Sequence, residues 1–251
     1  MSNYGYSPQR DWVNSHRQGP GTNRAPFGGW VRSLPPVTLA ILILCSVLGL
    51  VRIFSDGLTQ NFGFNFILAH QEWWRFLTSM FLHASNIHLV LNMMCLVLLG
   101  EQLERALGPV RYLLAFLVAG FAGSVGCALF TQVSGYQLHS WVMSPFTVVV
   151  GASGAIFGLF GILGVFQYRA KQLDSAFMII LALNVAVGFL APNIAWQGHL
   201  GGFLAGIVCG LLFTMRRGIL GKSITPAEIV GLLCLVGALA GLAWAKYHFM
   251  F

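Results

Sequence analysis

Long apolar stretches separated by short polar connectors make up most of the chain. Seven stretches have the length expected of a membrane-spanning helix: 36–53, 82–100, 110–132, 150–168, 175–191, 198–215 and 226–245. A helix needs about 20 mainly apolar residues to cross a hydrocarbon core about 30 Å thick. The pattern therefore predicts an all-α polytopic membrane protein with seven spans.

The connector from Ser55 to Leu82 departs from this simple alternation. Aromatic residues such as Phe62, Trp73 and Trp74 are interleaved there with polar residues. This mixture is typical of the interface between membrane and water. We expect the connector to form an element lying in that interface.

Positive charge is distributed unevenly over the connectors. Of the 14 Lys and Arg residues, all but Arg52, Arg75 and Lys246 fall in the tail 1–35 or in the connectors 101–111, 169–174 and 216–222. Cytoplasmic segments carry the excess of Lys and Arg in membrane proteins. The N-terminus is therefore predicted to be cytoplasmic, with the tail as a disordered cytosolic arm. Without an obvious organellar transit peptide, a bacterial plasma membrane is the expected location.

Composition narrows the function classes. Hydrophobic residues make up 57% of the chain and charged residues 8%, whereas about 25% is usual for soluble domains. A soluble catalytic domain is excluded, and the net charge of +7 follows from topology, so we expect no nucleic-acid partner. The cysteines all lie in apolar stretches without close pairs, which indicates neither a disulfide framework nor a cysteine metal site.

Two polar side chains at the starts of apolar stretches suggest chemistry. Ser153 lies in Gly151-Ala152-Ser153-Gly154, and His199 begins a stretch in which glycine recurs every fourth residue from Gly198 to Gly210. Glycine stripes allow membrane helices to approach closely. A serine hydroxyl becomes a good nucleophile only with a base about 2.6–3.2 Å away. The pattern predicts a Ser–His pair, although a packing serine and a hydrogen-bonded core histidine would explain each residue taken singly.

Further polar residues precede and open the second stretch. His88 and Asn92 are four residues apart and share a helix face. Their N–H groups could stabilise a developing oxyanion, or the cluster could merely hydrate the helix mouth. A zinc site from His83, His88 and His199 fits poorly because no acidic residue lies in the middle of a span to complete it. The same lack of carboxylates disfavours an aspartyl protease.

These residues resemble the motifs of the rhomboid intramembrane serine proteases. The resemblance covers about residues 36–215. It is carried by Gly151-Ala152-Ser153-Gly154, by His83-x4-His88-x3-Asn92, by Gly198-His199-Leu200-Gly201-Gly202 with Gly206, by Trp74-Arg75, and by Glu104 with Gly108. An arginine found in some members two residues after the glutamate is replaced by Ala106, beside Arg105. A seventh stretch follows the six, as in the six-plus-one members.

The resemblance implies a role for each matching residue. Ser153 would be the nucleophile and His199 the general base and acid. The oxyanion hole would consist of His88, Asn92 and the backbone N–H of Ser153. His83, Gly151, Gly154 and Gly202 would support the active site, and a gate would lie at about 189–197. No cofactor or metal is implied.

The resemblance also implies a domain organisation. The tail 1–35 would precede a rhomboid-like six-helix catalytic core over 36–215. A cytosolic connector and a seventh transmembrane helix would occupy 216–251.

The sequence thus predicts an intramembrane serine endopeptidase that cleaves in or near transmembrane segments of other membrane proteins. Its partners would be those substrates and the lipid bilayer. A catalytically inactive relative that binds membrane helices is the main alternative. A transporter is less favoured because the chain shows neither an inverted repeat nor a charge near the middle of a span.

Overall fold

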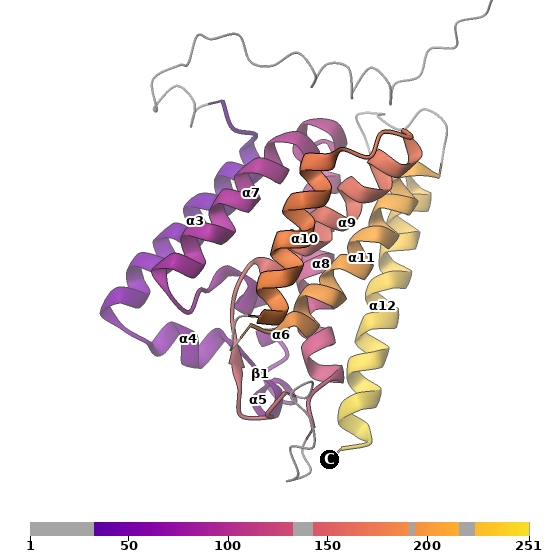
Figure 1. Cartoon of the computed structure of the whole chain (residues 1–251). Coiled ribbons are helices and arrows are strands. Elements are labelled where there is room, and N and C mark those ends of the chain that lie inside the picture. Colours follow the sequence, from indigo (N-terminus) through magenta and orange to yellow (C-terminus); the bar gives the residue numbers. More distant parts are fainter. Residues whose placement is uncertain (1–32, 133–142, 191–193, 216–223, 251) are drawn as a thin grey trace, which may run out of the picture.

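Seven long helices form the body of the protein in a computed structural model that describes residues 33–132, 143–190, 194–215 and 224–250. Each corresponds to one predicted stretch. They are α3 (Pro36–Phe54), α7 (Asn86–Leu107), α8 (Pro109–Leu129), α9 (Ser153–Arg169), α10 (Ser175–Leu190), α11 (Trp196–Thr214) and α12 (Pro226–His248) (Figure 1). The predictions for the tail 1–32 and the connector 216–223 lie outside the described residues.

Short elements gather at one end of the bundle, the lower end in Figure 1, which we call the loop end. It holds α4 (Gly57–Phe62), β1 (Phe64–Asn65), α5 (Phe66–Ala69), α6 (Arg75–Thr78), the 3-10 helix η1 (Ser79–Phe81) and β2 (Val148–Val149). The strands pair antiparallel, with Phe64 opposite Val149 and Asn65 opposite Val148. The connector 55–82 is therefore a folded unit with its own buried side chains, including Phe64 and Phe66.

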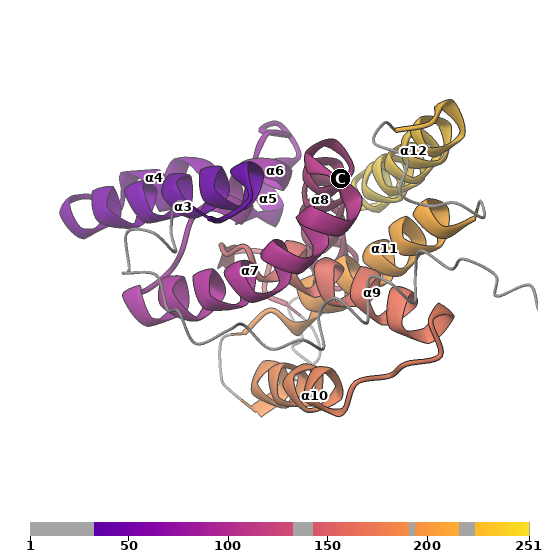
Figure 2. The ribbon, with the colours of Figure 1, turned by 90° about the horizontal axis from the view of Figure 1, so that it is seen from above.

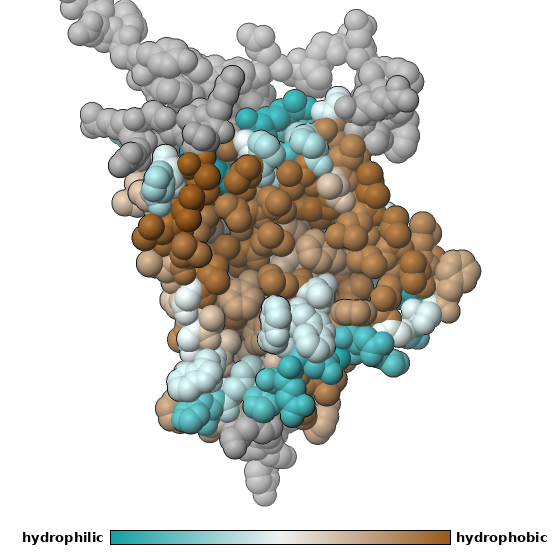
Figure 3. Space-filling view, turned by 180° about the vertical axis from the view of Figure 1, so that it is seen from behind, coloured by the Kyte–Doolittle hydropathy of each residue, from teal (hydrophilic) through white to brown (hydrophobic). Residues whose placement is uncertain are grey.

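The face of the molecule seen in Figure 3 carries a broad apolar band between two more polar ends. Among the described residues, five helices have the length and apolar character needed to cross a membrane: α3, α7, α8, α11 and α12. α9 has 17 residues, about 25 Å at 1.5 Å per residue, less than the apolar core of a bilayer, about 30 Å. If the end carrying Arg169 reaches the polar face, Ser153 at the other end lies within the apolar layer.

The centre of the bundle is the contact between α9 and α11, with α8 beside them (Figure 2). Here glycines let backbone meet backbone. A methyl group added to Gly202 would collide with the carbonyl oxygen of Gly154, and one added to Gly206 would collide with that of Gly158. Because lipid is as apolar as the side chains, close packing of this kind is a main source of helix association in membranes.

The polar end of α7 differs from the prediction. The segment 101–111 was predicted to be a loop, but α7 continues to Leu107 and only Gly108, with a φ of 80°, separates it from α8. Glu104 explains the extension, since its buried carboxylate caps the start of α3. It accepts hydrogen bonds from the N–H groups of Val37 and Thr38 and from the Thr38 hydroxyl, at 2.9, 2.7 and 2.7 Å.

Candidate active site

Ser153 and His199 meet near the loop end, at the starts of α9 and α11. The Ser153 Oγ lies 2.9 Å from His199 Nε2, across 46 residues of sequence. The structure thus brings together the two side chains that the sequence paired. Ser153 is the first residue of α9, where backbone N–H groups have no partner within the helix.

The imidazole of His199 is held by an aromatic ring. Phe157 stacks on it with ring centroids 4.2 Å apart and planes at 7°. Phe157 lies one turn after Ser153 on α9 and is buried. No Asp or Glu forms an ion pair with His199 in the described parts of the chain. The sequence interpretation missed Phe157, although its spacing of four from Ser153 places both on one helix face.

His88 lies against the backbone that leads into α9. A Cβ added to Gly151 would come within 2.7 Å of His88 Cε1 and 3.7 Å of Ser153 Oγ. Gly151 also has a φ of 137°, which L side chains rarely adopt. Only glycine leaves room for the imidazole at this point. His83 is buried beside it, with the two rings edge to face at 5.2 Å.

Asn92 is buried one turn further along α7. Its side-chain amide donates a hydrogen bond of 2.8 Å to the carbonyl of His88. A carboxamide has two N–H donors, so this bond fixes the orientation of the group while using one of them. His88 and Asn92 therefore share one face of α7, as their spacing predicted.

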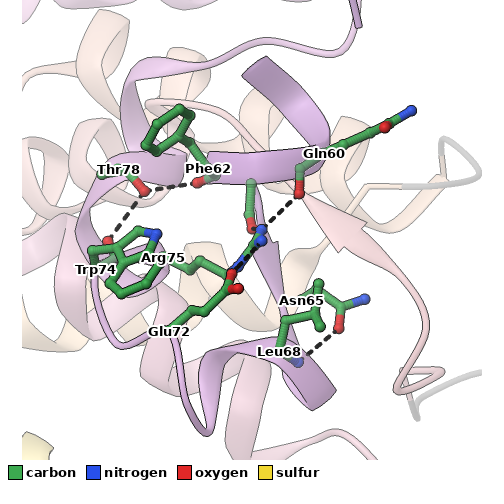
Figure 4. A network of polar contacts seen from close by, with 9 residues as sticks. Gln60, Phe62, Asn65, Leu68, Glu72, Trp74, Arg75 and Thr78 are labelled. Atoms are coloured by element: carbon green, nitrogen blue, oxygen red, sulfur yellow. Dashed lines mark hydrogen bonds and ion pairs between the residues drawn. The ribbon is translucent and has the colours of Figure 1, made fainter. Parts of the chain in front are cut away.

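The connector 55–82 supports the backbone before Ser153 at two points. β1 pairs with β2, and the carbonyl of Ser79 accepts a hydrogen bond of 3.0 Å from the Gly151 N–H. Arg75 stabilises this connector from within (Figure 4). Its buried guanidinium donates to the carbonyls of Gln60 and Gly63, both at 2.8 Å, and pairs with Glu72.

The remaining predicted features are placed as follows. In the described residues, no three His, Cys, Asp or Glu side chains gather closely enough to hold a metal ion. Ala106 is buried, while neighbouring Arg105 donates to the carbonyl of Ser33 at 2.6 Å. The proposed gate at 189–197 lies partly outside the described residues. At its end, Trp196 packs against Phe130 with ring centroids 5.3 Å apart.

Comparison with known proteins identifies the family. The profile of the Rhomboid domain matches residues 70–216, more than half of the chain. The protein belongs to the rhomboid family. It is 36% identical over 201 residues to the "Putative rhomboid protease YdcA" of Bacillus subtilis, an alignment that covers 73% of this chain and 92% of that one.

Two further relatives show how far the similarity to this rhomboid extends. The "Rhomboid protease GluP" of Bacillus subtilis is 33% identical over 66% of this chain and 31% of its own length. The "RHOMBOID-like protein 6, mitochondrial" of Arabidopsis thaliana is 35% identical over 60% and 47%. Each of these two relatives has more than half of its own length outside the region that it shares with this chain.

Proposed function

We propose that this rhomboid is an intramembrane serine endopeptidase that cleaves peptide bonds in or near transmembrane segments of other membrane proteins. The main support is the contact of 2.9 Å between Ser153 Oγ and His199 Nε2, since proton transfer from the hydroxyl requires this proximity. The names of two relatives as rhomboid proteases support the same reaction.

The reaction would proceed in two stages. Ser153 Oγ attacks the substrate carbonyl carbon while His199 Nε2 takes the hydroxyl proton. When the tetrahedral intermediate collapses, His199 returns that proton to the leaving amine, and an acyl-enzyme remains on Ser153. Water, deprotonated by His199, then attacks the ester carbonyl carbon. As this intermediate collapses, His199 returns the proton to Ser153 Oγ and the carboxylic acid is released. The dyad works without a carboxylate, and stacking on Phe157 orients the imidazole instead.

The negative charge on the carbonyl oxygen would be stabilised by donors around the start of α9. We assign this role to the backbone N–H of Ser153 and to the side chains of His88 and Asn92. His88 and Ser153 are close neighbours, since a Cβ on Gly151 would lie 2.7 Å from His88 Cε1 and 3.7 Å from Ser153 Oγ. Asn92 follows His88 one turn later on α7. One such donor lowers the barrier by about 3–4 kcal/mol in serine proteases. His83, Gly151, Gly154 and Gly202 maintain the packing of these groups.

The unequal distribution of Lys and Arg supports a cytoplasmic N-terminus and an active site that opens on the other side of the membrane. The residues 36–215 would form the catalytic core, with α12 added to it, in a bacterial plasma membrane. Substrate helices would have to unwind locally, because a helical peptide bond shields its carbonyl from attack.

The proposal is tested by hydrolysis of a reconstituted single-span substrate and by labelling with a fluorophosphonate. The wild type should cleave the substrate and be labelled, whereas Ser153→Ala and His199→Ala should lose at least about 1,000-fold in activity, because dyad members act as a unit. Ser55→Ala and His248→Ala replace exposed residues and serve as matched controls. A folded wild type that is neither labelled nor active would instead indicate an inactive membrane-helix-binding protein.

A further inference from the structure

The seventh long helix, α12, lies outside the region that matches the family profile, which ends at residue 216. It packs along α8. At the end opposite the loop end, Glu228 forms a buried ion pair with Arg111 of α8 at 3.1 Å and completes a capping box with Thr225. This end of α12 is therefore anchored to the core far from Ser153.

At the loop end, α12 is attached through Tyr247. The hydroxyl of this buried residue donates a hydrogen bond of 3.0 Å to the backbone carbonyl of Phe66. Its ring stacks on that of Phe66, with centroids 4.6 Å apart and planes at 18°. Phe76 meets it edge-on at 6.3 Å. One side chain of α12 thus holds both the backbone and the ring of the residue that follows β1.

Only a few residues of β1 and β2 connect Phe66 to the nucleophile Ser153. Phe64 of β1 pairs with Val149 of β2, and Val149 precedes Gly151 by two positions. Phe64, Phe66, Phe76 and Tyr247 belong to one hydrophobic cluster, and Val149 packs against it. Phe66 is therefore connected, through the two paired strands, to the backbone that leads into Ser153.

We propose that Tyr247 is a positioning residue for the proteolytic reaction, which it aligns by holding Phe66 and, through β1 and β2, the segment Val149–Ser153. The inference rests on the proposed function. It assigns to α12 a part in setting the geometry of the nucleophile in addition to its packing on α8. Tyr247 does not contact the reacting atoms and would act only through Phe66. Its loss should therefore lower kcat per active site and leave the number of active sites unchanged.

The test compares Tyr247→Phe with Tyr168→Phe, the same chemical change at a residue that is 74% exposed on α9. Titration with a fluorophosphonate counts competent active sites. kcat and KM for the reconstituted substrate and the Tm are measured on the same preparations. Tyr247→Phe keeps the ring but loses the bond to Phe66, so kcat per titrated site should fall about three- to ten-fold, the effect of one hydrogen bond. The titrated fraction and KM should stay close to wild type, and the Tm should fall by no more than a few degrees.

The outcomes separate positioning from simple stability. A lower titrated fraction or Tm with unchanged kcat per site would show that Tyr247 only stabilises the fold and would overturn the inference. Wild-type values throughout would overturn it as well. An equal decrease in Tyr168→Phe would attribute the effect to the substitution in general and contradict it. If the wild type itself is not labelled at Ser153, the proposed function fails, and the inference fails with it.

Discussion

The contact between α9 and α11 and the attachment of α12 hold helices together in different ways. In the first, glycines bring backbones together, so that Gly202 lies directly on the carbonyl of Gly154. In the second, long side chains bridge the helices, with Arg111 to Glu228 at one end and Tyr247 to Phe66 at the other. A backbone contact tolerates no added atom, whereas a side-chain contact can be weakened in steps. Ser153 and His199 therefore lie on the two helices, α9 and α11, whose backbones are already in contact and have no room for an added side chain.

The largest effect is expected where the glycine contact is obstructed. Gly202→Val should prevent α11 from reaching α9, because the new side chain would overlap the backbone carbonyl of Gly154. A backbone atom cannot move aside as side chains do in ordinary overpacking, so the cost should exceed the usual overpacking cost of about 1–3 kcal/mol. Fluorophosphonate labelling and the yield of folded protein in detergent should both collapse. Gly237→Val on α12 is the matched control, since an added Cβ there has nothing within 4 Å. Equal behaviour of the two variants would show that close backbone packing is not what joins the central helices.

The next effect concerns the ion pair at the start of α12. Glu228→Gln keeps a side chain that can complete the capping box but breaks the buried ion pair with Arg111, and breaking a buried pair costs about 3–5 kcal/mol. Equilibrium unfolding in mixed micelles measures the loss. The matched change Glu101→Gln removes an exposed pair with Arg105, worth about 0–1 kcal/mol. A loss no greater than that of Glu101→Gln would argue against an anchoring role for the Arg111 pair.

A smaller effect is expected from the ring that stacks on His199. Phe157→Leu keeps an apolar side chain but removes the stacking, and aromatic pairs contribute about 0.5–1.5 kcal/mol, so kcat should fall by about two- to twelve-fold. Phe157→Tyr should retain most of the rate because the ring remains. Turnover of the reconstituted substrate measures kcat, and the rate of labelling by the fluorophosphonate measures the reactivity of Ser153 in the same variants. Leucine and tyrosine variants of equal reactivity would exclude orientation of the imidazole by stacking.

Local patterns were sufficient to predict much of this architecture. Seven apolar stretches correspond to seven helices because the thickness of the bilayer sets the length that a span requires. The glycine repeat from Gly198 indicated a close contact, and the structure has α11 against α9. What the patterns could not supply was the end of α7, where the Glu104 carboxylate binds the start of α3, more than 60 residues earlier in the sequence.

The sequence by itself therefore determined the helices, the membrane setting and the two residues that meet at the candidate site, because hydrophobic length and glycine spacing are local properties of the chain. Only the tertiary structure decided which ring stacks on His199, which strands pair before Ser153 and which carbonyl Tyr247 binds. That last contact joins residues 181 positions apart. No periodicity records such a partner, because it is chosen by how the helices pack against one another.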